Sequence, residues 1–126
     1  MKLKYLALTA ALVIPAIGHA QNRTAVAVYC QNGNDTIGAR VCTSLRDELA
    51  RSPRYSLAND AEFALQISTV DPLAGIQGSQ GKLSAVAGVL TRNGYMVTMT
   101  IASCGGNMTA GCAQDILAQF DPSMSK

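Results

Sequence analysis

The four cysteines are the residues of this chain that could most directly do chemistry. Thiols in proteins act as redox centres, as metal ligands or as partners in structural disulfides. Redox pairs usually stand two residues apart at the start of a helix, and zinc sites use similarly short spacings. Here Cys30 and Cys42 are separated by eleven residues, and Cys104 and Cys112 by seven. These spacings favour structural disulfides over redox or metal chemistry.

The cysteines repeat one arrangement twice along the chain. Cys30 and Cys104 each end a predicted strand, and Cys42 and Cys112 each lie in the helix predicted to follow. Four cysteines allow three connectivities, and the sequence alone does not choose between them. The repeated arrangement favours Cys30–Cys42 with Cys104–Cys112 over the crossed alternatives. Each local bridge would stabilise the fold by about 3 kcal/mol, because it constrains the unfolded chain.

Residues 1–20 have the pattern of a cleaved signal peptide. Two lysines precede a short apolar run, and Gly18-His19-Ala20 forms a small-residue cleavage site before Gln21. Cleavage there would remove the single histidine of the sequence, and with it any histidine base, nucleophile pair or metal ligand. We expect a periplasmic or secreted protein consisting of residues 21–126, without catalytic residues, a metal or a cofactor.

The charge balance argues against nucleic-acid and membrane-surface partners. The chain has ten basic and eight acidic residues, but Lys2 and Lys4 lie in the predicted signal peptide. The exported part is therefore neutral overall, whereas nucleic-acid and anionic-lipid binders need an excess of positive charge. After the signal peptide, no apolar stretch approaches the roughly 20 residues of a membrane-spanning helix. We expect no nucleic-acid partner and no membrane anchor after signal cleavage.

Hydrophobic periodicity predicts the element order β-α-β-β-β-β-α. Asp35 has the position of a helix N-cap, Ser52-Pro53 should stop that helix, and Asn93-Gly94 is a strong hairpin signal. The expected strands span 25–30, 54–58, 63–69, 83–91 and 95–104, and the expected helices span 35–51 and 109–120, with Asp121-Pro122 ending the second and a loose tail over 123–126. Two helices on one face of a mainly antiparallel sheet would bury these apolar faces, which predicts a single α+β two-layer sandwich with a flexible glycine-rich loop over 71–82.

Two predicted strand–loop–helix junctions could in principle bind an anion at a helix N-terminus. The charge of Asp35 opposes this at the first junction. The second junction, Gly105 to Thr109, has no acidic residue, but it matches neither the dinucleotide-binding nor the P-loop pattern. We interpret it as a loop with positive φ angles, followed by Thr109 as a helix N-cap.

The carboxylates and arginines of the chain also have simpler interpretations than catalysis. Asp47 and Glu48 point in different directions on a helix and can pair with Arg51, while Asp60 and Glu62 fit a turn. Basic residues near the end of the first helix interact favourably with the helix dipole and need no ligand. Those basic residues are Arg46, Arg51 and Arg54. The sequence therefore predicts a protein that is not an enzyme.

The stretch from Ala25 to Asp71 resembles a known family of envelope domains. Its helix 35–50, the short strand at Arg54-Tyr-Ser-Leu and the segment Asp60-Ala-Glu-Phe-Ala-Leu-Gln-Ile are similar in order to the N-terminal domain of TolB and to periplasmic modules of the CsgG and LpoB type. The resemblance implies an envelope domain that works through protein–protein contacts. This chain differs from those proteins by its four cysteines, and we expect it to have neither a lipid anchor nor a further domain, so no functional residue is carried over.

Three functions remain open from the sequence. The first is a periplasmic accessory or adaptor protein that binds an unidentified envelope protein through its exposed sheet edge or through loop 71–82. The second is a secreted inhibitor of a hydrolase, which would need a protruding, rigid loop. The third is a domain that binds a small ligand on its sheet face, with Tyr95 or Tyr55 lining the pocket.

Overall fold

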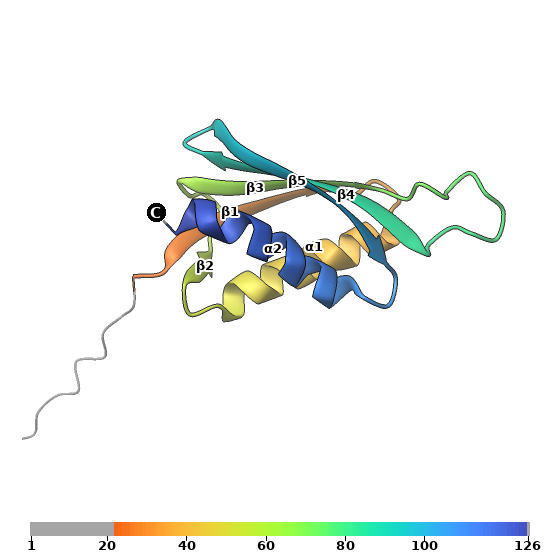
Figure 1. The fold of residues 1–126 in the computed structure, drawn as a ribbon, viewed down its shortest axis with the longest axis horizontal. Helices are drawn as coiled ribbons and strands as arrows, with labels where there is room; N and C mark the ends of the chain where they lie inside the picture. The colour runs from red at the N-terminus through yellow and green to blue at the C-terminus, as the bar shows by residue number, and fades with distance from the viewer. Residues whose placement is uncertain (1–21, 126) are drawn as a thin grey trace, which may run out of the picture.

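The computed structural model describes residues 22–125, so the predicted signal peptide, residues 1–20, lies outside the described residues. In this part of the chain the elements follow the predicted order (Figure 1). They are β1 (Thr24–Gln31), α1 (Thr36–Arg51), β2 (Tyr55–Leu57), β3 (Phe63–Val70), β4 (Leu83–Arg92), β5 (Tyr95–Gly105) and α2 (Thr109–Met124).

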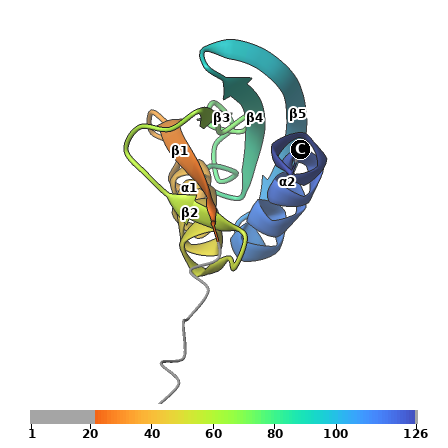
Figure 2. The same cartoon turned by 90° about the vertical axis from the view of Figure 1, so that its left-hand side faces the viewer.

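The strands form one mixed sheet in the order β2-β1-β3-β4-β5. Strand β1 lies parallel to β2 and β3, and the two longest pairings, β3 with β4 and β4 with β5, are antiparallel. Both helices pack on the same face of this sheet, α1 under its β1 side and α2 under β5 (Figures 1 and 2). The predicted α+β two-layer sandwich is confirmed, with β2 and β5 as the edge strands.

Helix α1 begins where the sequence predicts, because Asp35 caps it. The Asp35 carboxylate accepts a hydrogen bond from the Gly38 backbone N–H at 2.9 Å, and the helix ends at Ser52, before the proline. One stripe of the helix is fully buried against the sheet. It consists of Ile37, Val41, Leu45 and Leu49.

A glycine lets α1 approach β3 closely. A Cβ atom added to Gly38 would overlap the side chain of Thr69 on β3 and would also press on the Asp35 carboxylate. The first turn of α1 therefore lies directly against the end of β3, where any larger residue would force the helix away from the sheet.

The turn between β4 and β5 is the predicted tight hairpin. Asn93 and Gly94 have φ angles of 52° and 83°, as a type I′ turn requires. The register shifts once between the two strands: Leu90 lies opposite Thr98, and Thr91 lies opposite Met96. Val97 is thus the extra residue of a β-bulge, which increases the local twist of the hairpin.

Two predictions about α2 are wrong. The helix continues through Pro122 to Met124. Residues 123–125 of the expected loose tail are tied down, because Met124 is buried and the Ser125 backbone N–H bonds to the Asp121 carbonyl, while Lys126 lies outside the described residues. Proline is tolerated here because it costs only one hydrogen bond in the last turn, while Met124 gains a place in the core. The sequence signal of Asp121-Pro122 is overridden by this burial.

The start of α2 also differs from the prediction. Thr109 is the first helical residue rather than the N-cap; Met108 occupies the cap position and makes no side-chain cap bond. Neither Gly105 nor Gly106 has a positive φ angle. The disulfide at Cys112 links the first turn of this helix to β5, so the junction is fixed covalently rather than by a capping side chain.

We predict that Gly38→Ala lowers the free energy of unfolding by about 1–3 kcal/mol, because the new methyl group must displace Thr69 or α1. Gly111→Ala is the matched control: this helical glycine has open space around its Cβ position, so the same change should stabilise the protein by about 0.5–1 kcal/mol. Urea denaturation of both variants measures the two effects. Equal behaviour of the two variants would contradict the close helix–sheet contact.

Candidate functional site

The cysteines form two local disulfides, Cys30 with Cys42 and Cys104 with Cys112. The Cα–Cα distances are 6.5 and 5.8 Å, within the range of natural disulfides. These are the pairs that the repeated arrangement in the sequence favours. Each bridge ties the end of a strand to the early part of the following helix, and no cysteine is left free for redox or metal chemistry.

The charged residues do not assemble into a site. Arg51 pairs with Glu48 at 2.9 Å, Arg54 pairs with Asp121 on α2, and Arg46 donates to the backbone carbonyl of Val28. The three arginines predicted as a cluster therefore point to separate partners. Glu62 forms an ion pair with Arg92. Within residues 22–125, no group of three or more potential metal ligands occurs.

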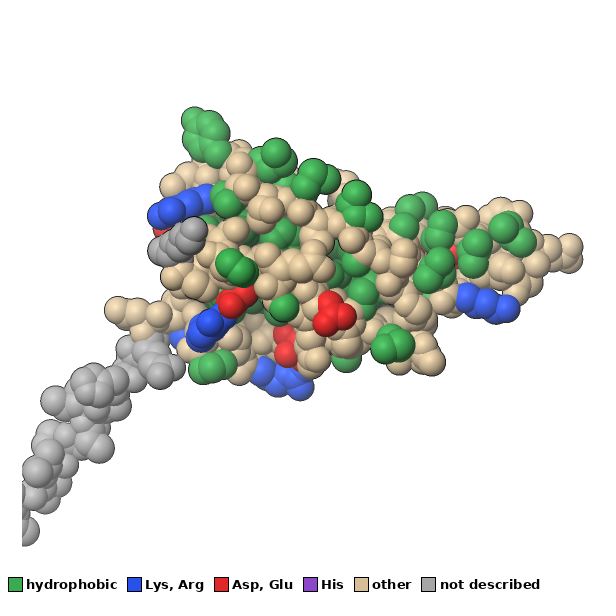
Figure 3. Space-filling view, viewed as in Figure 1, with side chains coloured by type: hydrophobic (Ala, Val, Ile, Leu, Met, Phe, Trp, Pro, Cys, Tyr) green, Lys and Arg blue, Asp and Glu red, His purple; other side chains and the backbone are tan. Residues whose placement is uncertain are grey.

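The outer face of the sheet, which points away from the helices, carries no charged side chain on β3, on β5 or on β4 up to Thr91. Alternation along each strand identifies this face, because the opposite positions are buried under α1 and α2. Hydrophobic side chains project along this side of the molecule (Figure 3). The outer face of β3, β4 and β5 consists of Ala64, Gln66, Ser68, Val70, Ala85, Ala87, Val89, Thr91, Met96, Val97, Met99, Ile101 and Ser103.

Strand β5 is the most apolar part of this face and lies at the edge of the sheet. Its large apolar side chains point to solvent: Met99 is 55% exposed and Ile101 is 74% exposed. The smaller, more polar residues face the helices instead, and the buried Thr100 donates its hydroxyl hydrogen bond to Gln119 on α2. Alternation along the sequence separates Met99 and Ile101 from Thr98 and Thr100, but it does not show which set faces water, and it places Met96 on the wrong face because it does not reveal the bulge.

The β-bulge enlarges this apolar surface. Thr91 faces outward, so its partner Met96 faces outward too, beside the extra residue Val97. We define the β5 patch as the exposed apolar side chains of this strand. They are Tyr95, Met96, Val97, Met99 and Ile101.

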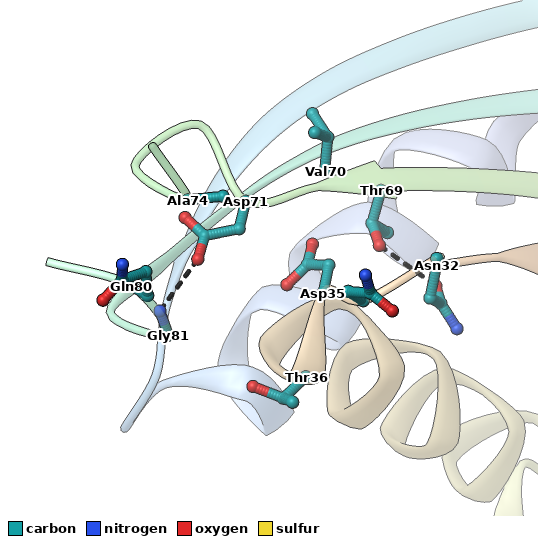
Figure 4. A pocket seen from close by; sticks show the side chains of 11 residues that line it. Asn32, Asp35, Thr36, Thr69, Val70, Asp71, Ala74, Gln80 and Gly81 are labelled. Carbon is teal, nitrogen blue, oxygen red and sulfur yellow. Dashed lines mark hydrogen bonds between the residues drawn. The ribbon is translucent and has the colours of Figure 1, made fainter. Parts of the chain in front are cut away.

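A second candidate lies at the far end of the sheet, where a pocket of about 460 Å³ opens between the start of α1, the end of β3 and loop 71–82 (Figure 4). Asp35 is buried at its base and accepts hydrogen bonds from Gly38 and from the Ser84 hydroxyl. Asp71 accepts from the backbone N–H groups of Leu73 and Gly81, both at 2.8 Å. The loop is therefore fastened at its base by one carboxylate.

The two carboxylates of this pocket and the Thr69 hydroxyl are already used by the fold. Each carboxylate has two donors, and the Thr69 hydroxyl donates to the Asn32 side chain at 3.1 Å (Figure 4). The lining contains Asp35 and Asp71 but no basic side chain, so an anion is disfavoured there. At the first strand–loop–helix junction, the residue predicted to oppose anion binding is Asp35, and the structure shows its carboxylate buried and hydrogen-bonded.

The two tyrosines proposed for a small-ligand pocket lie in different surroundings. Tyr55 lines an open hollow of about 540 Å³ together with Pro53, Arg54 and Ser125. Tyr55 is buried, and its hydroxyl contacts Asp121 and Ser125 at the end of α2. Tyr95 is 79% exposed at the hairpin end of β5.

Neither helix of the described part is both long and apolar enough to cross a membrane.

Comparison with known proteins identifies a shared fold and no family. The sequence matches no known family profile and no curated protein. Among solved structures, the fold is similar to that of a PelC variant from Paraburkholderia phytofirmans, solved as a dodecamer. The two chains are 14% identical with a TM-score of 0.58, over 79% of this chain and 88% of that one. At this identity the similarity concerns the fold alone.

We predict that tryptic digestion of the non-reduced protein yields peptide 24–40 linked to peptide 41–46, because these contain Cys30 and Cys42. Peptide 93–126 contains both other cysteines, so it should appear unlinked and two hydrogens lighter than its reduced form. Mass spectrometry reads both results. A link between peptide 93–126 and either of the first two peptides would show a crossed connectivity.

We also predict that Asp71→Ala frees the base of loop 71–82, since the two backbone N–H groups lose their acceptor. Amide hydrogen exchange at Leu73 and Gly81 should accelerate, with little change in the melting temperature, because the loop is outside the core. Asp60→Ala is the control, because it removes a carboxylate from another exposed loop. Unchanged exchange at Leu73 and Gly81 would show that the Asp71 contacts do not hold the loop.

Proposed function

We propose that this protein is an exported, non-enzymatic accessory or adaptor protein of the cell envelope, acting through protein–protein contacts made by the outer face of the sheet. The observation that carries the proposal is the β5 patch. Five large apolar side chains stand exposed along one edge strand. Four of them, Met96, Val97, Met99 and Ile101, lie on a sheet face without charge over β3 and β5. Exposed apolar surface of this extent is typical of interaction sites, because it is costly to leave in water.

The position of the patch at a sheet edge supports the same function. An edge strand presents backbone N–H and C=O groups that have no partner within its own sheet. A binding partner can add a strand there and gain main-chain hydrogen bonds, while the apolar side chains give it specificity. Strand β5 combines both features over eleven residues.

Three further observations fit an envelope role. Two disulfides are compatible with a periplasmic or secreted protein, because such compartments are oxidising. The resemblance of residues 25–71 to the TolB, CsgG and LpoB type of domain suggests a module that contacts other envelope proteins. The PelC variant with the same fold assembles into a dodecamer, so this architecture is compatible with a role in assembly.

The protruding loop 71–82 favours a second candidate, the inhibitor of a hydrolase. This loop extends beyond the sheet (Figure 1), is fastened at its base by Asp71 and exposes Ile76. An inhibitor would insert such a loop into an enzyme's cleft. We rank this function second because the loop exposes one large apolar side chain, Ile76, whereas the β5 patch exposes five.

In-cell photo-crosslinking tests the two functions against each other. A photoreactive amino acid replaces Met99 on the β5 patch, Ile76 on the loop, or Met108 near the start of α2 as an exposed control. We predict that Met99 gives a discrete adduct with an envelope protein, identified by mass spectrometry, and that Met108 does not.

The other outcomes are equally informative. Adducts from Ile76 alone, with a hydrolase as the captured protein, would favour the inhibitor. Equal adducts from all three positions, or none above background, would overturn the proposed role of the outer face.

A further inference from the structure

The β5 edge lacks the features with which proteins usually protect exposed strands. Natural edges carry lysine, proline or inward-pointing charges, or are covered by a loop or helix. The segment Tyr95–Gly105 has no charged residue and no proline, and its single bulge lies near one end, between Met96 and Thr98. From Thr98 to Gly105 the strand is regular and its outer edge has no neighbouring strand in the described part of the chain.

The β5 edge of one molecule can pair with the β5 edge of a second copy of the protein. Two antiparallel copies of one strand, related by a two-fold axis, present the same backbone groups to each other. Free N–H groups of each copy can therefore bond to free C=O groups of the other. Charge does not oppose the approach, because β5 is uncharged and the part of the chain predicted to be exported is neutral overall. A charged partner strand would gain no ion pair here, because β5 has no charged side chain.

One register pairs the apolar outward side chains Val97, Met99 and Ile101 with one another. If the two-fold axis passes through Met99, then Met99 lies opposite its own copy, and Val97 lies opposite Ile101 on both sides. Moving the axis to Thr100 would still place Met99 opposite Ile101 on both sides, but Val97 would lie opposite Ser103. Apolar cross-strand pairs are the main stabilising contacts between antiparallel strands, so the register centred on Met99 is favoured.

We infer that two copies of this protein pair through antiparallel β5 strands centred on Met99, which joins their sheets into one ten-stranded sheet. The inference rests on the proposed function, because it assigns a second copy of the protein, rather than a strand of the envelope partner, to the edge of the same site. The two outer faces then form one larger apolar face, and this face remains open to the envelope partner. Both pairs of helices lie together on the opposite side.

Sedimentation of the exported protein over a concentration series tests this pairing. We expect a monomer–dimer equilibrium for the natural sequence. Met99→Lys and Met99→Glu should each raise the dimer dissociation constant by roughly tenfold or more, because like charges then face each other across the axis. An equimolar mixture of the two variants should dimerise again, since lysine then faces glutamate. Met108→Lys, which adds the same charge at another exposed methionine, should leave dimerisation unchanged.

Several results would overturn the inference. These are a natural protein that stays monomeric at the highest attainable concentration, a Met99→Lys variant that dimerises normally, and a mixture that does not recover. Melting temperatures check that each variant is folded, which the exposure of Met99 leads us to expect.

The two proposals fail separately. A monomeric protein whose Met99 still crosslinks to another envelope protein would refute the self-pairing and leave the accessory function standing. A dimeric protein whose Met99 crosslinks only to its own copy would support the self-pairing and refute the adaptor role.

Discussion

Burial of one sheet face under α1 and α2 is the contact on which the other features of this protein depend. The apolar stripe of α1 and the buried side chains of α2, among them Ile116 and Phe120, cover the inner side chains of the sheet. Two helices of sixteen residues suffice for one face of five strands, and the described chain has no further element for the other. The outer face is therefore open, and its composition decides what the protein can bind.

Several short-range links hold the two layers in place. Asp35 joins the start of α1 to β4 through Gly38 and Ser84, and the two disulfides tie each helix to the end of the strand before it. At the opposite end, the Tyr55 hydroxyl and Arg54 contact Asp121 near the end of α2. These polar groups are used by the fold, so the Asp35 carboxylate is already occupied by two donors in the pocket beside it. The β5 patch, in contrast, has no role in holding the layers together.

Much of this architecture is predictable from local sequence signals. The N-cap at Asp35, the proline after α1 and the Asn93-Gly94 turn each act over a few residues, so they identify element boundaries correctly. The end of α2 is not predictable in this way, since burial of Met124 outweighs the local cost of Pro122. The outward orientation of Met99 and Ile101 also escapes prediction. It depends on the helices covering the side with Thr100, and alternation alone shows two faces without showing which is buried.

The central claim is that the edge and outer face of β5 form the contact surface of this protein. Hydrogen exchange of residues 21–126, the part predicted to be exported, tests it most directly. The exchange is read by mass spectrometry in dilute solution and again in concentrated periplasmic extract. The account predicts slower exchange in residues 95–105 in the extract, with no change over α1. Protection confined to loop 71–82 or to the helices, or unchanged exchange throughout the chain, would contradict it.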